Sequence, residues 1–268
     1  MDSPAIPAIP VTSRMSFLWA ERGTVLVDGH AVVLATTDTV MPLPVAAAAA
    51  LLLEPGTSIT HAAVKACADS ECLVLWVGEA GVRCYAAGNP GRNAEALLRQ
   101  AAAALDPAAR LAVTREIFWR MFGERAPHGR SVEQIRGMEG ARVRALYSAI
   151  AAREGVSWDG RNAKDADDPI NRAISIANAA LYGLVEAVVL ALGFSPAIGF
   201  VHSGGSRSFV YDIADCVKFS TVTPLAMRVA KESADDIEGR TRRACRNLFR
   251  SMHLAEQIES VIEGIFHD

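Results

Sequence analysis

The hydrophobic pattern of the chain changes once along its length, near the Gly/Pro-rich stretch at residues 88–92, GNPGR. Before this stretch the apolar segments are short, rich in β-branched residues and separated by Gly or Pro, as in residues 24–27, 31–35 and 73–77. After it, apolar residues recur at the spacing of long helices. The sequence therefore predicts an α+β fold, with a small β-rich domain ahead of a larger all-helical domain.

The same signals predict where each part begins and ends. We expect an extended arm over residues 1–14, which hold three prolines, and a β-rich domain over 15–87. A linker over 88–93 and the helical domain over 94–268 follow.

Within the β-rich part, Thr60 is placed to cap one short helix over residues 61–68. Residues 46–50 have helical propensity, yet we predict that residues 51–53 form a strand, because Pro55-Gly56 follows them directly.

Local start and stop signals divide the helical part. Ser131 and Gln134 have the form of a capping box, and Asp168-Pro169 is a cap with proline at the first helical position. A final helical stretch is expected to break near Met252. The expected helices cover residues 94–104, 107–122, 131–153, 168–192, 209–219, 224–231 and 235–266.

Composition narrows the function classes. The chain has 268 residues, 51% of them hydrophobic, which is enough for a sizeable core. A net charge of −3 argues against a passive nucleic-acid coat but leaves room for a local basic groove. Five cysteines without a CxxC spacing exclude zinc-finger and disulfide frameworks and favour reduced thiols in the cytoplasm. The apolar runs at 45–53 and 184–192 are too short to span a membrane, so we expect no membrane association.

Residues 198–218 concentrate the side chains that carry chemistry. His202 precedes a short Gly/Ser loop, and Asp212 and Asp215 follow it, three residues apart. Three residues are close to one helical turn, so both carboxylates share a helix face. We expect this helix to begin near Ser208, with the Ser hydroxyl capping its first amides, and the loop to fold His202 back over the acidic face. One imidazole and one or two carboxylates suit Mg²⁺ or Mn²⁺ better than a structural zinc.

These residues also have ordinary interpretations, since an Asp pair is usually a solvated helix face and a lone His is usually a core residue. The apolar neighbours favour the metal, because buried carboxylates need a counter-charge. Glu139 lies between Gly137 and Gly140, two glycines that cost about 1 kcal/mol each in a helix. It is either a surface residue beside a packing notch, or a third ligand with His202 and Asp215 where the glycines allow a close approach.

Three longer segments together carry a family resemblance. They read LEPGTSITHAAVKA…LVLWVGEAGVRCYAAG (53–88), RSVEQIRGMEGARVRALY (130–147) and NAALYGLVEAVVLALGFSPAIGFVHSGGSRSFVYDIADCVKF (178–219). They resemble the CRISPR spacer-acquisition integrase, the catalytic subunit of the adaptation complex, in its type I-E form. The similarity runs from about Met15 to the C-terminus.

The resemblance implies a function and its partners. The family is a metal-dependent DNA endonuclease and integrase that inserts protospacer DNA into a CRISPR repeat and leader by 3′-OH transesterification, in antiviral defence. It has a sandwich-like N-terminal domain and a helical catalytic domain. It forms an asymmetric homodimer, and such dimers clamp a protospacer duplex and a small ferredoxin-like partner dimer.

The resemblance also implies roles for individual residues. Glu139, His202 and Asp215 would hold Mg²⁺ or Mn²⁺, and Asp212 would be an adjacent supporting acid. The residues expected to contact DNA are Arg83, Tyr182, Tyr211, Lys218 and Arg243.

Two departures from the family pattern are visible. The family form places an aromatic residue before the glycine of its first β-hairpin, where it stacks on the duplex end. Arg22 stands at that place here, before Gly23; arginine can also stack on bases. The family form often continues into a proline-rich tail that helps to read the protospacer-adjacent motif, and this role is expected to be missing from residues 1–268.

Two other functions remain open at this stage. One is a non-catalytic DNA-binding scaffold that uses the arginines of residues 240–250. The other is an all-helical Mg²⁺ diphosphate enzyme using the acids at 165–168 and 212–215, although the first pair reads more simply as a solvated loop. The glycine-rich stretches at residues 78–81 and 204–205 do not fit a nucleotide-binding pattern, so we expect no nucleotide cofactor.

Overall fold

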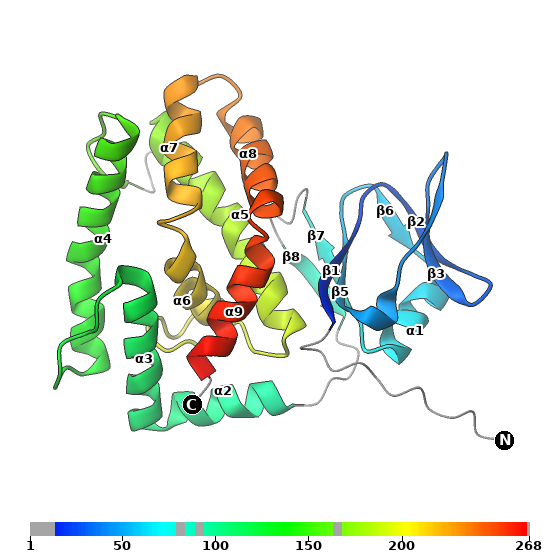
Figure 1. The fold of residues 1–268 in the computed structure, drawn as a ribbon, viewed down its shortest axis with the longest axis horizontal. Helices are drawn as coiled ribbons and strands as arrows, with labels where there is room; N and C mark the ends of the chain where they lie inside the picture. Colours follow the sequence, from blue (N-terminus) through cyan, green and yellow to red (C-terminus); the bar gives the residue numbers. More distant parts are fainter. Residues whose placement is uncertain (1–13, 79–83, 89–93, 163–167, 267–268) are drawn as a thin grey trace.

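The computed structural model describes residues 14–78, 84–88, 94–162 and 168–266 (Figure 1). The arm expected over residues 1–14 and the linker expected over 88–93 fall almost wholly outside these ranges. The strands are β1 (Met15–Ala20), β2 (Gly23–Asp28), β3 (Ala31–Ala35), β4 (Val40–Pro42), β5 (Ala48–Leu53), β6 (Thr57–Ile59), β7 (Leu73–Val77) and β8 (Cys84–Gly88). The helices are η2 (Val45–Ala47), α1 (His61–Asp69), α2 (Glu95–Leu105), α3 (Pro107–Phe122), α4 (Val132–Glu154), α5 (Pro169–Ala191), α6 (Ser208–Val217), α7 (Val222–Glu232), α8 (Ile237–Ser251) and α9 (Leu254–Phe266).

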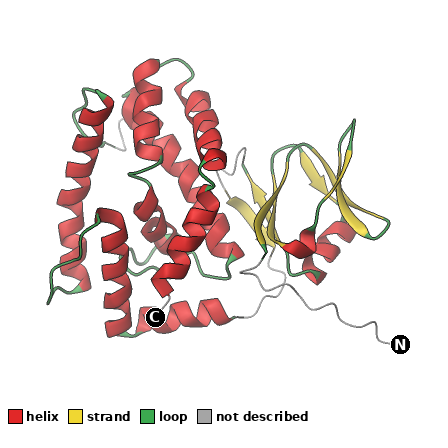
Figure 2. Ribbon diagram, in the orientation of Figure 1, coloured by secondary structure: helices red, strands yellow, loops and turns green. Residues whose placement is uncertain are grey.

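Strands and long helices occupy opposite sides of the molecule, which confirms the predicted α+β class (Figure 2). The strands form two four-stranded sheets, ordered β1-β5-β7-β8 and β4-β3-β2-β6. Pairing is parallel for β1·β5, β5·β7 and β2·β6, and antiparallel for β7·β8, β2·β3 and β3·β4. Side chains from both sheets and from α1 share one apolar core, so the strand-rich part is sandwich-like.

Strand β5 is apolar throughout because both of its faces are covered. Leu51 and Leu53 point into the core between the two sheets. Ala50 and Leu52 pack instead against α5, together with Ala187 of that helix. Residues 46–50 have helical propensity, but only the single 3₁₀ turn η2 is helical, and the expectation is wrong for residues 48–50, which belong to β5. The reason is that every residue of β5 is buried, as in a strand covered on both faces.

The turn at Arg22 is not the tip of a hairpin. β1 pairs with β5 and β2 pairs with β3, so residues 21–22 connect one sheet to the other. The hairpin that we expected at this place is wrong, because β1 finds its partner about thirty residues later rather than across the turn. Arg22 is exposed and has a left-handed backbone, with φ of 50°.

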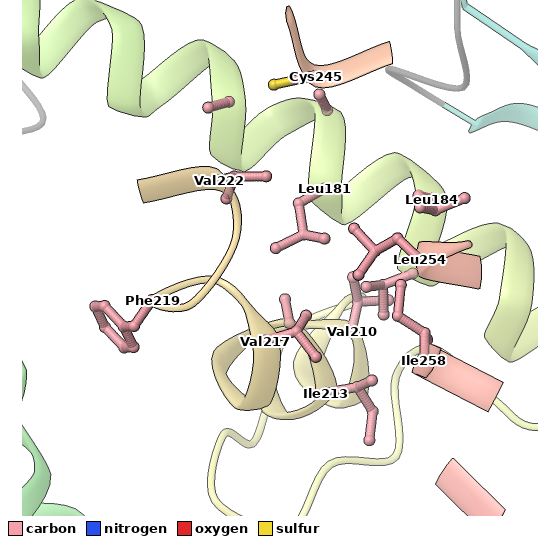
Figure 3. Close-up of a cluster of buried hydrophobic side chains, with 14 of the residues drawn as sticks. Leu181, Leu184, Val210, Ile213, Val217, Phe219, Val222, Cys245, Leu254 and Ile258 are labelled. Atoms are coloured by element: carbon pink, nitrogen blue, oxygen red, sulfur yellow. The ribbon is translucent and has the colours of Figure 1, made fainter. Parts of the chain in front are cut away.

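The helical part is built around α5. Fourteen of its residues are buried, and α6, α7, α8 and α9 all contact it. Figure 3 shows how apolar side chains of these helices, among them Leu181, Ile213 and Ile258, meet in one core. α5 is long and apolar enough to cross a membrane, but 67% of its most apolar window is buried inside the molecule, as in a core helix.

Most of the helix starts and stops were predictable from local signals. Thr60 caps α1, the Ser131–Gln134 capping box opens α4, and Asp168 caps α5 ahead of Pro169. The final helical stretch is broken between α8 and α9 at Met252, as expected.

Candidate metal centre

Helix α6 carries the two aspartates, and its start differs from the expectation. Ser208 is the first helical residue rather than a cap, so the predicted Ser cap is wrong. Its hydroxyl donates to the Gly205 carbonyl oxygen (2.9 Å) and accepts from the Gly205 amide (3.1 Å). The serine therefore closes the Gly/Ser loop instead of serving the amides of α6.

Asp212 organises the segment that leads to His202. Its Oδ2 accepts from the backbone amides of Phe200 (2.6 Å) and Val201 (3.2 Å), and its Oδ1 accepts from the amide of His202 (2.9 Å). The same Oδ1 lies 2.8 Å from Nδ1 of the His202 ring. A neutral imidazole that donates its Nδ1–H to Asp212 keeps its lone pair on Nε2, which is the form that a metal ligand needs.

Glu139, His202 and Asp215 converge. Each offers one ligand atom, and these atoms all lie within 4.8 Å of one another. Glu139 comes from the middle of α4, His202 from the loop before α6, and Asp215 from α6. Within the described ranges they are the only group of three or more such side chains close enough to share one ion.

The electrostatics of the cluster favour a cation. Burial, followed by the nearby Asp215 carboxylate, raises the pKa of Glu139 above its ordinary value. The hydrogen bond with Asp212 raises the pKa of His202. Both shifts have the sign that excess negative charge in a half-buried site produces. Two carboxylates and one imidazole are also a donor set that Mg²⁺ and Mn²⁺ accept, so the residues present fit a divalent ion.

The cluster borders a small cavity of about 10 Å³, which is room for little more than one water or ion. Apolar side chains complete its wall, namely Ile117, Phe118, Met121, Ile135 and Val201. Water exclusion by such a wall strengthens the interaction between the carboxylates and a bound charge.

Lys218 is buried beside the cluster, only 8% exposed. Its Nζ lies 2.5 Å from Asp215 Oδ1 and 4.7 Å from the centroid of the Phe219 ring. Burial is the largest single influence and lowers the pKa of Lys218, but the charge and hydrogen bond of Asp215, with Tyr182 and Tyr147, together outweigh it and the pKa is raised. The ammonium group is therefore charged and offsets part of the negative charge around Asp215.

Tyr211 and Tyr182 line the approach to His202. The Tyr211 ring centroid is 5.8 Å from that of His202 and 5.0 Å from that of Tyr182, both edge-on. Burial raises the pKa of Tyr182 to about 12, so its hydroxyl stays neutral at physiological pH. Lys218 and Tyr211 thus lie beside the cluster, and Tyr182 lies beside Tyr211. Their expected contacts with DNA stay a prediction.

The other predicted DNA contacts lie elsewhere. Arg243 is exposed on α8 and pairs with Asp236 at 2.8 Å, with no contact to the cluster among the described interactions. Arg83 lies outside the described residues. The other arginines of α8 are also ion-paired, with Glu232, Glu238 or Glu21; they are Arg240, Arg242, Arg246 and Arg250.

Two expectations about neighbouring residues need correction. A Cβ added at Gly137 would meet nothing within 4 Å, and one at Gly140 would meet only Arg144 at 3.9 Å. None of the described residues therefore requires glycine at either position, so the expected close approach of another backbone is not seen there. The close approach of a ligand stays a prediction. The proposed acid pair at 165–168 has one member outside the described residues, and the other, Asp168, is the cap of α5.

Sequence reasoning missed two side chains that support the site from a distance. Arg110 of α3 donates from Nε and a terminal guanidinium nitrogen to the Phe200 carbonyl oxygen at 3.3 and 3.2 Å. Arg207 pairs with Glu186 of α5 at 2.9 Å and so ties the end of the Gly/Ser loop to the core helix. No local pattern announces contacts that join residues so far apart in the chain.

Comparisons with known proteins identify the family. The model of the family described as CRISPR associated protein Cas1 matches residues 17–125 and 119–246. A CRISPR-associated endonuclease Cas1 of Geobacter sulfurreducens is 46% identical, over 98% of this chain and 88% of that protein. The protein of the same name from Escherichia coli K12 is also 46% identical, over 96% of this chain and 86% of that protein.

Solved structures agree with these relatives. The TtCas1–DNA complex has a TM-score of 0.86 at 40% identity, covering 95% of this chain and 97% of that one. A casposase bound to its integration product has a TM-score of 0.62 at 15% identity, covering 94% of this chain and 95% of that one, and so shares the fold.

The fold and the site together define a CRISPR-associated endonuclease, with a strand-rich domain ahead of a helical one. Within this class the chain belongs to the Cas1 family, as its full-length similarity to the curated members shows. The resemblance seen in the sequence is confirmed.

Proposed function

We propose that this protein is a metal-dependent DNA endonuclease and integrase that inserts protospacer DNA into a CRISPR array. The observation that carries the proposal is the convergence of Glu139, His202 and Asp215, within 4.8 Å, in a member of the Cas1 family. The similarity to the Escherichia coli relative favours the type I-E form.

In the proposed reaction, the 3′-hydroxyl of the protospacer attacks a phosphodiester of the repeat. A new P–O bond forms, the old P–O bond breaks, and the attacking hydroxyl's proton ends on the released 3′-oxygen. No Ser or Cys nucleophile is needed, because DNA supplies the attacking group. Catalysis then consists mainly of positioning and of charge stabilisation.

Glu139, His202 and Asp215 are the residues that would hold Mg²⁺ or Mn²⁺. When bound, the ion would neutralise the charge that develops on the phosphoryl oxygens. Asp212 orients His202 through Nδ1, and the ammonium group of Lys218 is bonded to Asp215. We expect Tyr182 and Tyr211 to contact the reacting strand, and the edge-on contacts of Tyr211 with His202 and with Tyr182 support this.

The proposed DNA-binding residues outside the cluster are Arg83 and Arg243, which we expect to contact flanking phosphates. TtCas1 has been crystallised with DNA, which supports DNA as a partner of this chain. By the family resemblance we further propose a homodimer in the cytoplasm that binds the protospacer, the repeat and leader, and a small ferredoxin-like partner dimer.

A non-catalytic scaffold is the weaker alternative. Its proposed surface, the arginines of residues 240–250, is ion-paired within the molecule. A scaffold also has no use for a half-buried cluster of two acids and a histidine, whose negative charge Lys218 offsets only in part.

The proposal is tested by strand transfer with purified components. The protein, its small partner and a short duplex with free 3′-hydroxyls are incubated with a supercoiled repeat-bearing plasmid, in Mn²⁺ or in EDTA. We expect integration in Mn²⁺ only, and its loss by at least about 100-fold in Asp215→Asn and His202→Ala. Asp38→Asn removes one exposed carboxylate from the β3–β4 turn and should behave as wild type.

Duplex binding, measured in parallel, separates chemistry from affinity. We expect both site variants to bind the duplex within about threefold of wild type, because the flanking phosphate contacts remain. Integration that continues in EDTA or in Asp215→Asn would overturn the proposal.

A further inference from the structure

Residues 195–202, here called the His202 segment, have no helical or strand structure. Phe200 and Val201 within the segment are nonetheless buried. A buried backbone without regular structure needs hydrogen-bond partners from outside. The Pro196 carbonyl oxygen accepts from the Phe209 amide at 2.8 Å, and Asp212 accepts from the amides at the end of the segment.

Gln100 of α2 provides the partners at the other end of the segment. Its side chain is completely buried. Nε2 donates to the carbonyl oxygens of Ser195 (3.0 Å) and Ile198 (2.8 Å), while Oε1 accepts from the Ser195 amide at 2.7 Å. Both N–H groups and the oxygen of the Gln100 amide are thus bonded to the His202 segment.

Hydrogen-bond donors hold one side of the His202 segment and an acceptor holds the other. Gln100 and Arg110 donate to carbonyl oxygens from α2 and α3. Asp212 accepts from the amides on the α6 side. The path of the backbone between Ser195 and His202 is therefore determined by side chains from three helices.

We infer that Gln100 is a positioning residue for the metal centre. By fixing Ser195 and Ile198, it sets where the segment delivers His202 relative to Glu139 and Asp215. The inference rests on the proposed metal function of that cluster. Gln100 does not contact the cluster itself, so its effect reaches the ligands only through the path of the backbone.

Few residues could replace Gln100, because its side chain is the hydrogen-bond partner of three backbone groups. Leucine at this place would fill the volume but leave the Ser195 amide and two carbonyl oxygens without partners, so the segment would shift to find new ones. A ligand displaced by about 1 Å is enough to lose most of the benefit of a preformed site.

The test measures Mn²⁺ binding to the full-length protein without DNA, from the signal of free Mn²⁺ in electron paramagnetic resonance. We expect Gln100→Leu to weaken Mn²⁺ binding about tenfold, as when a metal site loses a supporting residue. Backbone amide exchange at Phe200 and His202 should become faster in the same variant. Gln100→Glu keeps the acceptor for the Ser195 amide but turns a carboxylate toward two carbonyl oxygens, so it should weaken binding as well.

Two matched controls separate positioning from a general loss of stability. Gln257→Leu removes another glutamine that donates to a backbone carbonyl, that of Met252 at 2.7 Å in the chain before α9. Val25→Ala truncates a core side chain of the strand-rich part and should lower the melting temperature. Both should bind Mn²⁺ as wild type does. If Gln100→Leu is too unstable to assay, Gln100→Glu and its amide exchange decide the question.

The outcomes are distinct. Mn²⁺ binding within twofold of wild type in Gln100→Glu and in folded Gln100→Leu would overturn the inference while leaving the proposed function intact. Equal weakening in Val25→Ala would also overturn it, since stability alone would then explain the effect. If wild type binds no Mn²⁺, or His202→Ala binds it normally, the proposed metal centre and the inference both fail.

Discussion

Asp212 and Asp215 illustrate how position gives one residue type two functions. They lie on the same helix, three residues apart, and both are buried. The carboxylate oxygens of Asp212 are hydrogen-bonded to three backbone amides and to the His202 ring. Asp215 instead faces Glu139, His202 and Lys218. In the proposed metal centre the first would orient His202 and the second would be a ligand of the ion.

We expect Asp212→Asn to weaken Mn²⁺ binding by about 10- to 100-fold, the range for losing the partner of a ligating histidine. The asparagine NH₂ group must face either a backbone N–H or the imidazole, so the free energy of unfolding should also fall by about 1–3 kcal/mol. Mn²⁺ titration and urea unfolding of the same samples measure the two effects. Normal Mn²⁺ affinity in a folded Asp212→Asn would contradict an orienting role.

At the scale of elements, the N-terminus of α5 shows a carboxylate used for structure. Asp168 Oδ1 accepts from the Ile170 amide at 3.0 Å, and Oδ2 accepts from the Asn171 amide (3.2 Å) and side chain (2.5 Å). Oδ2 also accepts from Nε1 of Trp158 at 3.1 Å. A group so fully engaged in capping the core helix is poorly suited to bind a diphosphate-linked Mg²⁺.

Asp168→Ala should therefore lower the free energy of unfolding by about 1–3 kcal/mol, through the lost cap and the unpaired Trp158 and Asn171 donors. Mn²⁺ affinity should not change. Chemical denaturation and Mn²⁺ titration check these two statements, with Asp38→Asn as an exposed control. A variant that keeps its stability but loses Mn²⁺ binding would restore the diphosphate-enzyme alternative.

At the scale of the whole molecule, one carboxylate links the two parts. Glu21, between β1 and β2, pairs with Arg246 (3.0 Å) and Arg250 of α8. Exposed ion pairs are worth only about 0–1 kcal/mol. Their larger effect is on electrostatics, since they neutralise arginines that would otherwise be available to phosphate groups.

Glu21→Gln should leave the melting temperature nearly unchanged and strengthen duplex binding. The dependence of log K on log salt concentration should steepen by about 1–2, because up to two arginines become free to contact phosphates. Fluorescence anisotropy over a salt series gives this slope. Asp38→Asn makes the same change in net charge without freeing an arginine, and an equal slope in the two variants would show that only net charge matters.

The sequence predicted the features that depend on local signals. Caps at Thr60, Ser131 and Asp168 are recognisable within four residues, so most helix boundaries were placed well. The family resemblance named three residues from separate parts of the chain, Glu139, His202 and Asp215, that the structure brings together. No other backbone among the described residues approaches Gly137 closely, contrary to one of the two expectations for it. The helix propensity of glycine shows that the residue lowers helix stability, but it does not show why glycine is there.

The features that escaped prediction depend on distant partners. β5 was ambiguous because a strand covered on both faces lacks the alternation that distinguishes it from a helix. Ser208 was assigned as a cap from its position alone, although a loop carbonyl competes for its hydroxyl. Gln100 gave no signal at all, because its partners lie 95 and 98 residues further along the chain.

The two-sided burial of β5 has a practical consequence for any attempt to study the parts separately. One face of its sheet, with Ala50, Leu52 and Leu75, packs against α5 of the helical part. A fragment ending near residue 88 would expose this hydrophobic surface to water, and the remainder of the chain would expose Ala187 and Ala191. Each fragment alone would leave a hydrophobic face uncovered, so we expect both to aggregate when expressed alone and to stay soluble when produced together.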